Sequence, residues 1–385
     1  MRVPAANSSA LRYPCTGPVA TRGFGVFVER ELGAPRANLR AFARSLGRTF
    51  GTQRLTLVNS GSSANLAASL ALAEVAGAGA HAVTAGFTFP TTVSSLLTAG
   101  FDVSVADTAP GAFHLDPAAL RRAIRRDTRV VVVTHFLGFP ADLDAVLAIA
   151  REKKLLVLQD ACESMDLRIG DREAHQRGTL TTWSFYHPHH LSAFGGGAVI
   201  SSSEEWQRRV ESISHWGRAC TCHVDDLVCR APKGFDHQFT YPRAGHNLEM
   251  SELNACFGRF QLARFSRDEG GRRARYAILE RALAGLDRAH IYPAPPDSGS
   301  PFVFPITLRR GRRAPLVARL RARGVETRSL MGGPIVDQPA YRDLAHDGLE
   351  NCRSLAARSF LVGIHQTLPV PDVHAVASIL REELA

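Results

Sequence analysis

Apolar and polar residues along the chain form alternating blocks that predict strands and helices in turn. Short runs of β-branched and aliphatic residues lie at 54–58 (RLTLV), 129–136 (RVVVVTHF), 154–160 (KLLVLQD) and 198–201 (AVIS). The first run leads through a Gly-Ser turn into ANLAASLALAEVA, a pattern typical of a helix. Continuous apolar strands between helices indicate a mostly parallel sheet that is covered on both faces.

The pattern starts again after residue 262. An arginine-rich helical stretch is followed by the strand-like FVFPITL, another helical stretch and a C-terminal helix. A chain of 385 residues is long enough for a large and a small domain. We therefore predict an α/β fold with a large domain at 1–262, which includes the N-terminal segment, and a smaller α/β domain at 263–385.

The composition is that of an ordinary globular protein, with 45% hydrophobic and 21% charged residues. No apolar run approaches the roughly 20 residues that are needed to span a bilayer. The N-terminus lacks the basic-then-apolar pattern of a signal peptide. We expect a cytoplasmic protein without a membrane partner.

The net charge of +10 comes almost entirely from arginine, because the chain has only three lysines, Lys153, Lys154 and Lys233. Such a bias is typical of a GC-rich genome. A basic balance favours a phosphate-bearing, nucleotide-linked substrate, and it also permits nonspecific affinity for nucleic acid. Since the basic residues form no long stripe and are not interleaved with aromatic residues, we predict no nucleic-acid function.

Two segments place polar groups where a predicted strand ends. NSGSSANLAA puts Gly61, Ser62 and Ser63 at a helix N-terminus, where backbone amides, the helix dipole and hydroxyls suit a phosphate. Asp160 ends another strand, and a carboxylate there can keep the ring nitrogen of pyridoxal phosphate protonated. Each segment also fits a purely structural role, because Gly-Ser turns often precede helices and Asp often caps a helix or forms a turn.

Two further segments add an aromatic ring and a glycine run. GFTFPTT offers Phe89 as a face to stack on a cofactor ring, although a phenylalanine taken alone is more often a core residue. WSFYHPHHLSAFGGGAVI carries Ser184 and His189 ahead of three consecutive glycines.

The order and spacing of these four segments resemble the DegT/DnrJ/EryC1/StrS sugar aminotransferases over roughly residues 40 to 380. The resemblance implies the pyridoxal-phosphate-dependent transferase fold of type I, which is that of aspartate aminotransferase. In that family the fourth segment reads approximately Ser-Phe-x-x-x-Lys-x-Leu, and its lysine forms a Schiff base with the coenzyme. Here the same stretch, 184–191, reads Ser-Phe-Tyr-His-Pro-His-His-Leu, so His189 occupies the lysine position.

The resemblance extends to other segments. AGHNLEMSELNACFGRFQL is similar to the family's Gly-x-Asn-x-x-Met segment, which implies that Asn247 reaches the phosphate of a neighbouring subunit in a homodimer with shared active sites. ETRSLMGGPIVDQPAY resembles the substrate segment and assigns Arg328 to the substrate. The resemblance also assigns Glu163 to the cofactor and His190 to the substrate. The family's Gly-Glu-Gly-Gly run is Phe-Gly-Gly-Gly at 194–197, which leaves no acidic residue there.

A histidine at the lysine position changes the expected chemistry. Imidazole forms no stable Schiff base, and none of the three lysines lies in a cofactor motif. The resemblance therefore implies noncovalently held pyridoxamine phosphate. A near-neutral pKa suits His189 to take a proton from the C4′ carbon, which leads to dehydration rather than amino transfer. The alternative is a structural histidine in an inactive paralogue.

The cysteines add a second chemical feature. The chain contains Cys15, Cys162, Cys220, Cys222, Cys229, Cys256 and Cys352. An odd count in a protein that we expect in the cytoplasm argues against a disulfide framework. A cysteine after Asp160 and a downstream Cys-x-Cys…Cys group resemble the iron–sulfur CDP-4-keto-6-deoxyhexose 3-dehydrase branch. This resemblance implies a [2Fe–2S] cluster bound by the four cysteines at positions 162, 220, 222 and 229, although the last gap is one residue shorter here.

Two alternatives to a cluster stay open for these four cysteines. Four thiolates suit a structural zinc ion as well as a two-iron cluster. The thiols can also be unliganded, as we expect for Cys15, Cys256 and Cys352, which match no motif.

The sequence therefore predicts an iron–sulfur-assisted, pyridoxamine-phosphate-dependent enzyme that removes the C3 hydroxyl of a nucleotide-linked 4-keto-6-deoxyhexose. A flavin/iron–sulfur reductase or ferredoxin is the expected electron donor. Three alternatives stay open: a cluster-free dehydratase regenerated by glutamate, the same chemistry on a non-hexose ketone, and a catalytically silent subunit.

Overall fold

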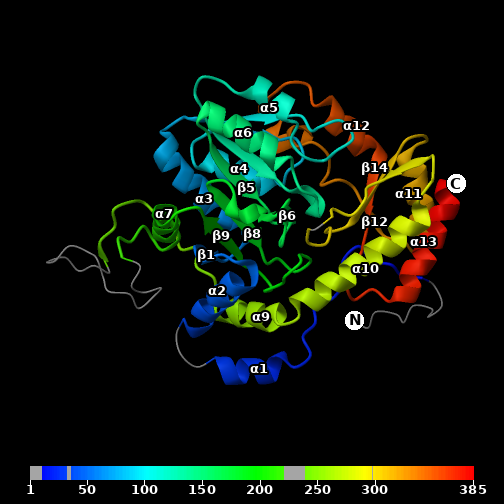
Figure 1. Ribbon diagram of the computed structural model, residues 1–385, viewed down its shortest axis with the longest axis horizontal. Coiled ribbons are helices and arrows are strands. Elements are labelled where there is room, and N and C mark those ends of the chain that lie inside the picture. Colours follow the sequence, from blue (N-terminus) through cyan, green and yellow to red (C-terminus); the bar gives the residue numbers. More distant parts are fainter. Residues whose placement is uncertain (1–10, 33–35, 221–238, 297) are drawn as a thin grey trace.

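We describe the protein from a computed structural model, which covers residues 11–32, 36–220, 239–296 and 298–385. A sheet of eight strands forms the centre of the larger part (Figure 1), in the order β1-β9-β8-β5-β4-β2-β3-β13. The strands are β1 (Leu55–Val58), β2 (His81–Ala85), β3 (Asp102–Ala106), β4 (Thr128–Thr134), β5 (Leu156–Asp160), β8 (Leu180–Ser184), β9 (Gly197–Ser201) and β13 (Ala345–His346). Only β9 runs antiparallel to both of its neighbours, so the predicted, mostly parallel sheet is confirmed.

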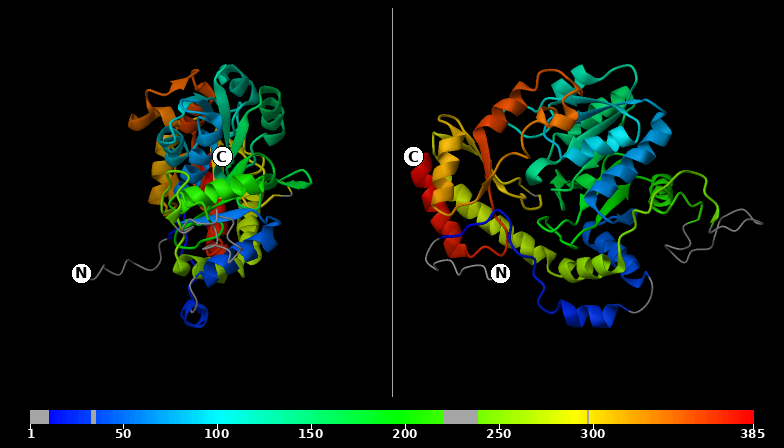
Figure 2. Two further views of the ribbon diagram at one scale, coloured as in Figure 1. Left: turned by 90° about the vertical axis from the view of Figure 1, so that its left-hand side faces the viewer. Right: turned by 180° about the vertical axis from the view of Figure 1, so that it is seen from behind.

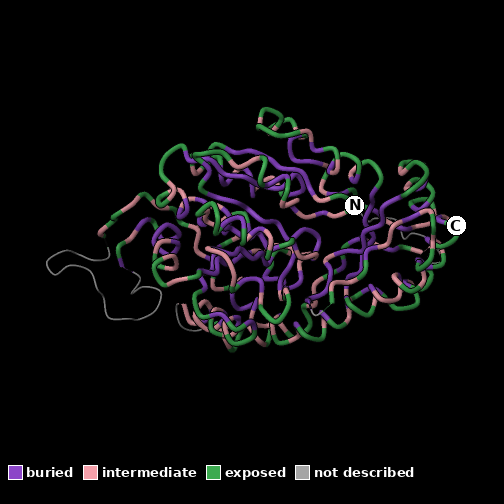
Figure 3. The backbone as a smooth tube through the Cα atoms, turned by 45° about the horizontal axis from the view of Figure 1, so that its top comes forward, coloured by how far each residue is buried: buried purple, intermediate pink, exposed green. Residues whose placement is uncertain are grey.

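Helices cover both faces of this sheet, and β4 shows why. Val130 and Val132 pack into a cluster with residues of α3 and α4, whereas Val131 and Val133 pack into another cluster with residues of α5 and α6. The helices are α3 (Gly61–Ala76), α4 (Pro90–Thr98), α5 (Pro117–Ala123) and α6 (Leu143–Lys153). Because side chains alternate across a strand, a strand buried on both faces is mostly apolar along its whole length. Figure 3 shows the buried residues concentrated in the centre of the fold.

A second, antiparallel sheet lies in the C-terminal part of the chain, with the strand order β10-β11-β14-β12. Its strands are β10 (Ala289–Ile291), β11 (Phe304–Leu308), β12 (Thr327–Arg328) and β14 (Ser359–Val362). It shares a core with the helices α10 (Phe265–Leu283), α11 (Arg313–Ala322) and α13 (Val370–Leu384). Figures 1 and 2 show α10 extending from the large sheet's side of the molecule to α13.

Two backbone pairings connect these parts. The C-terminal strand β13 pairs with β3 of the large sheet, and Tyr13 of the N-terminal segment pairs with Val325 beside β12. The domain boundary at residue 262 stays a prediction. The remaining structural elements include α7 (Glu204–Ser214), α12 (Glu350–Arg358) and a hairpin of β6 (Arg168–Ile169) and β7 (Arg172–Glu173).

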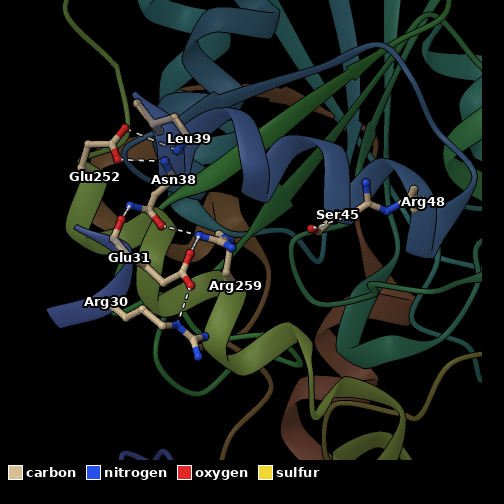
Figure 4. A network of polar contacts seen from close by, with 8 residues as sticks. All are labelled: Arg30, Glu31, Asn38, Leu39, Ser45, Arg48, Glu252 and Arg259. Atoms are coloured by element: carbon tan, nitrogen blue, oxygen red, sulfur yellow. Dashed lines mark hydrogen bonds and ion pairs between the residues drawn. The ribbon is translucent and has the colours of Figure 1, made fainter. Parts of the chain in front are cut away.

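The N-terminal helices are anchored to α9 by a polar network (Figure 4). The elements involved are α1 (Phe24–Glu31), α2 (Ala37–Phe50) and α9 (Glu252–Leu262). The carboxylate of Glu252 accepts the amides of Asn38 at 3.0 Å and Leu39 at 3.4 Å. It thereby satisfies first-turn donors of α2, whose N-cap residue supplies no side-chain acceptor. Arg259 donates to the side chains of Asn38 at 2.7 Å and Glu31 at 2.9 Å.

Candidate active site

A cavity of about 460 Å³ opens where three parallel strands of the large sheet end. Thr134, Asp160 and Ser184 are the last residues of β4, β5 and β8, and all three line it. The N-terminus of α3 contributes Gly61 from the same side. In open α/β sheets, ligands bind beyond the carboxyl ends of the strands, which makes this cavity the candidate active site.

The predicted phosphate cradle lies at one end of the cavity. Ser60 caps α3 by accepting the amide of Ser63 at 3.0 Å, and Ser62 donates its hydroxyl to Thr91 at 3.0 Å. A Cβ on Gly61 would lie 2.6 Å from the Cβ of Ser184, so this position accepts only glycine without a shift of the chain. Gly61 and Ser62 line the cavity, whereas Ser63 does not. The helix N-terminus and the nearby hydroxyls suit an anion.

Asp160 is buried at the end of β5, and both of its carboxylate oxygens are occupied. Oδ2 accepts Asn65 Nδ2 at 3.0 Å and Thr92 Oγ1 at 2.5 Å, and Oδ1 accepts the amide of Cys162 at 3.1 Å. Asn65 is held in turn by Thr182, whose hydroxyl donates to its amide oxygen at 2.7 Å. These neutral donors fix the carboxylate in one orientation in the cavity.

Sequence reasoning missed Asn65 and Thr92, which both contact Asp160. Asn65 is a buried amide in an alanine-rich helix, a pattern that marks a side chain with a specific partner. Thr92 sits in the first turn of α4 and carries no such signal. Only the packing of α3 and α4 against each other brings the two side chains to Asp160.

Glu163 lies close to Asp160 in the cavity wall. Its carboxylate accepts the amide of Leu137 at 2.9 Å. Burial, opposed by this hydrogen bond, raises the pKa of Glu163 to about 7. The carboxyl group therefore exchanges protons near neutral pH, within the cavity that also contains Asp160.

His189 also faces the cavity, and its ring is held by aromatic contacts. The ring lies edge-on to Phe302, with centroids 5.3 Å apart, and to Tyr186, at 5.8 Å. Its Nδ1 atom is buried without a hydrogen-bond partner among the described residues. Burial of the ring, followed by the electrostatic effects of His190 and Arg272, lowers the pKa of His189 to about 3, although the residue as a whole is only partly buried. This pKa lies below the near-neutral value expected from the sequence.

Of the remaining predicted residues, some line the cavity and others do not. Phe89, at the start of α4, and Arg328, in β12, line the cavity and remain exposed to solvent; Arg328 pairs with Glu326 at 2.5 Å. His190 instead turns away and bonds the carbonyl of Ser300 at 2.9 Å. Asn247 is exposed and outside the cavity lining, so its predicted role toward a neighbouring subunit stays a prediction, as does the contact of His190 with substrate.

The cysteine set is only partly described. Cys162 lines the cavity, and a Cβ on Gly61 would lie 3.1 Å from its sulfur. Cys220 is buried beyond the end of α7. Cys222 and Cys229 lie outside the described residues, among which no group of three potential metal ligands occurs. The four-cysteine cluster therefore stays a prediction. In the part of the chain that the structure covers, no helix has the length and apolarity to cross a membrane.

Residues 34–381 match the DegT/DnrJ/EryC1/StrS aminotransferase family over nearly the whole chain. The chain belongs to this family. A dTDP-4-dehydro-2,6-dideoxy-D-glucose 3-dehydratase from Saccharopolyspora spinosa is 33% identical over 375 residues, which cover 91% of this chain and 81% of the relative.

Solved structures agree on the fold. The Escherichia coli GDP-4-keto-6-deoxy-D-mannose-3-dehydratase with bound hydrated PLP superposes with a TM-score of 0.86, at 20% identity, over 98% of this chain and 100% of that chain. The Helicobacter pylori aminotransferase PseC gives a TM-score of 0.84, at 17% identity, over 97% and 99%. These similarities confirm the predicted aspartate-aminotransferase-like α/β fold. Dehydratases and aminotransferases share it, so the choice between the two activities depends on the residues of the site.

Proposed function

We propose that this protein is a pyridoxamine-phosphate-dependent 3-dehydratase and that His189 accepts the proton in place of a Schiff-base lysine. One observation carries the proposal: an imidazole with an unpartnered, buried nitrogen lies in a cavity to which no lysine of the described chain contributes. Lys153 and Lys154 are exposed at the C-terminal end of α6, and Lys233 is outside the described residues. An enzyme without a lysine at this site cannot run the usual transamination.

The residues that line the cavity suit the parts of the coenzyme. A side chain on Gly61 would fill the space beside Ser184 at the start of α3, where a phosphate is best held. Asp160 would hold the ring nitrogen, and Phe89 offers a ring face for stacking. When bound, pyridoxamine phosphate supplies an amine that condenses with a ketone and a ring that withdraws electrons.

The residues of the chain would transfer protons and bind the substrate and the phosphate. His189 is unprotonated at neutral pH and can take the proton from the C4′ carbon. Glu163, with its pKa near 7, is a second group that can exchange a proton in the same cavity. Arg328 at the rim would contact the substrate, and Asn247 of a second subunit would complete the phosphate site in a homodimer.

The substrate class follows from the 3-dehydratase relatives, whose names specify nucleotide-linked 4-keto sugars. We propose a nucleotide-linked 4-keto-6-deoxyhexose that loses its C3 hydroxyl. The overall replacement of that hydroxyl by hydrogen needs two electrons. In our proposal they come from a flavin/iron–sulfur reductase or ferredoxin through a [2Fe–2S] cluster held by Cys162, Cys220, Cys222 and Cys229.

The proton-accepting role of His189 is tested by exchange of the C4′ hydrogens of bound pyridoxamine phosphate with deuterium from D₂O. Mass spectrometry measures the exchange. His189→Asn should keep coenzyme binding and slow exchange by about 10²- to 10⁴-fold, the usual contribution of a general base. His187→Asn is the matched control, because His187 is two residues away and outside the cavity lining. Exchange at the parent rate in His189→Asn would refute the proposed role.

The cluster is tested by anaerobic reconstitution with iron and sulfide, absorption spectroscopy and metal analysis. We expect two irons per chain, lost in Cys162→Ser and retained in Cys256→Ser. A zinc-only or metal-free protein would overturn the cluster. A metal-free protein that turns over with glutamate and no reductase would identify the glutamate-regenerated dehydratase.

A further inference from the structure

Arg272 is a buried arginine on α10 that contacts the backbone of the segment carrying His189. Its side chain is almost fully withdrawn from solvent, at 1% exposure. Nη2 donates to the carbonyl of Pro188 at 3.2 Å and to that of His189 at 3.4 Å. Nη1 donates to the carbonyl of Phe302 at 3.2 Å. One guanidinium thus connects two segments that are more than 100 positions apart in the sequence.

The segments that carry His189 and Phe302 are also in contact through these two side chains. The ring of Phe302 lies edge-on to the ring of His189, at an interplanar angle of 78°. The guanidinium carbon of Arg272 lies 6.0 Å from the centroid of the Phe302 ring. Arg272 therefore fixes the main chain that carries the imidazole and also the residue against which the imidazole packs. A guanidinium suits this task because its donors form a rigid, planar fork.

Arg272 is buried without an ion pair among the described residues, which makes a purely structural role costly. Glu269, one turn earlier on α10, bonds the amide of Ser300 at 2.9 Å, and its other oxygen has no partner in the described part of the chain. Burial raises the pKa of Glu269 and lowers that of Arg272. Because a buried charge is costly unless it is paired, the presence of Arg272 points to a role in function.

We propose that Arg272 is a positioning residue, whose guanidinium holds the backbone of Pro188 and His189 and the ring of Phe302 so that the imidazole of His189 faces the cavity. This inference rests on the proposed function, in which His189 accepts the proton. Arg272 is not itself one of the residues that line the cavity, so it acts only through His189.

The charge of Arg272 adds a measurable signature. After burial and the neighbouring His190, Arg272 contributes to lowering the pKa of His189, whereas Asp160 acts in the opposite direction. Removal of the positive charge should therefore raise the pKa of the imidazole. The acid limb of the pH–rate profile, where exchange slows because the imidazole becomes protonated, should then move to higher pH.

The test compares Arg272→Gln, Arg272→Lys and His189→Asn, with Arg273→Gln as the control from an exposed position on the same helix. The readouts are pyridoxamine phosphate affinity and the pH profile of C4′ hydrogen exchange in D₂O. Arg272→Gln should lose about 100-fold in exchange rate, the effect of a misplaced catalytic group, and should shift the acid limb upward. Arg272→Lys should slow exchange while the acid limb stays in place, because the charge remains and the fork is lost. Arg273→Gln should match the parent protein.

The outcomes separate this inference from the proposed function. Parent-like exchange in His189→Asn would refute the base itself. Slow exchange in His189→Asn with parent-like exchange in Arg272→Gln would overturn the positioning role alone. Slower exchange with an unmoved acid limb in Arg272→Gln would also overturn it, since general loosening has that signature. If Arg272→Gln does not fold, Arg272→Lys decides: a parent-like rate, or slower exchange together with weaker pyridoxamine phosphate binding, overturns the inference, and slower exchange with parent-like binding supports it.

Discussion

Asp160 and His189 line the same cavity, yet they differ in their hydrogen bonding. The oxygens of Asp160 accept three hydrogen bonds from Asn65, Thr92 and Cys162. The Nδ1 atom of His189 has no partner among the described residues, although it is equally shielded from water. One group is held in a single orientation, whereas the other keeps a free nitrogen that can take a proton.

In the proposed function, Asp160 holds the coenzyme and His189 takes the proton, and the hydrogen bonding of the two groups differs accordingly. Satisfied buried polar groups stabilise a fold, because their removal leaves donors without partners. An unpartnered buried nitrogen costs stability, so it is expected where chemistry needs it. Substitutions at these two groups and their neighbours should therefore differ in their cost to stability.

Asp160→Ala should give the largest loss of stability. It leaves the donors of Asn65, Thr92 and Cys162 buried without their acceptor, and we expect a loss of about 3 kcal/mol in the free energy of unfolding, measured by urea denaturation. Asp102→Ala is the control, because the side chain of Asp102 is 55% exposed and its ion pair with Arg125 should contribute under about 1 kcal/mol. Equal effects of both substitutions would contradict a structural network around Asp160.

Thr92→Val should have an intermediate effect. Valine keeps the shape of the side chain and removes only the hydrogen bond to Asp160, so we expect a loss of about 1.5 kcal/mol in urea denaturation. Thr91→Val provides a neighbouring control, since Thr91 is only partly buried and its hydroxyl meets that of Ser62. A loss below that of Thr91→Val would show that the Thr92 hydroxyl does not support Asp160.

His189→Asn should change stability least at pH 7 and more at low pH. The folded protein holds the pKa of His189 at about 3, below the ordinary 6.5, so only the unfolded chain binds this proton between those values. The parent therefore loses stability as the pH falls from 6.5 toward 3, and His189→Asn should be spared about 1 kcal/mol of this loss at pH 5.5. Thermal unfolding at both pH values, with the exposed His374→Asn as control, measures the effect. An equal decline in the parent and in His189→Asn would place a protonated imidazole in the folded state.

Much of the fold could be read from the chain because its strands are buried on both faces. The runs at 54–58, 129–136, 154–160 and 198–201 are predominantly apolar and correspond to β1, β4, β5 and β9. The strands β2, β3 and β8 were not predicted from the sequence, because His81, Asp102 and the threonines of β8 interrupt their apolar pattern. His81 is nevertheless buried between Thr128 and Ser104, which satisfy both ring nitrogens.

The candidate site was predicted in part. Gly61 begins α3 and Asp160 ends β5, so their position at the carboxyl edge of the sheet follows from a parallel topology, whereas Ser184 was assigned by the family resemblance alone. Ser63 and His190 were expected in the site, but the structure uses Ser63 in a helix cap and His190 in a bond to Ser300. Neighbouring residues in a sequence point in different directions once a turn is fixed, and sequence spacing does not reveal which one faces the cavity.

The α/β fold, the family and the histidine at the position of the expected lysine follow from the amino-acid sequence. The surroundings of Asp160 and His189 follow only from the packing of the folded chain. Packing brings Asn65 and Thr92 to Asp160, buries the Nδ1 atom of His189 and places Arg272 against the backbone of His189. Local patterns encode strands and helices because these depend on near neighbours along the chain. Partners of a buried charge come from distant segments, and their meeting depends on how the helices and sheets pack.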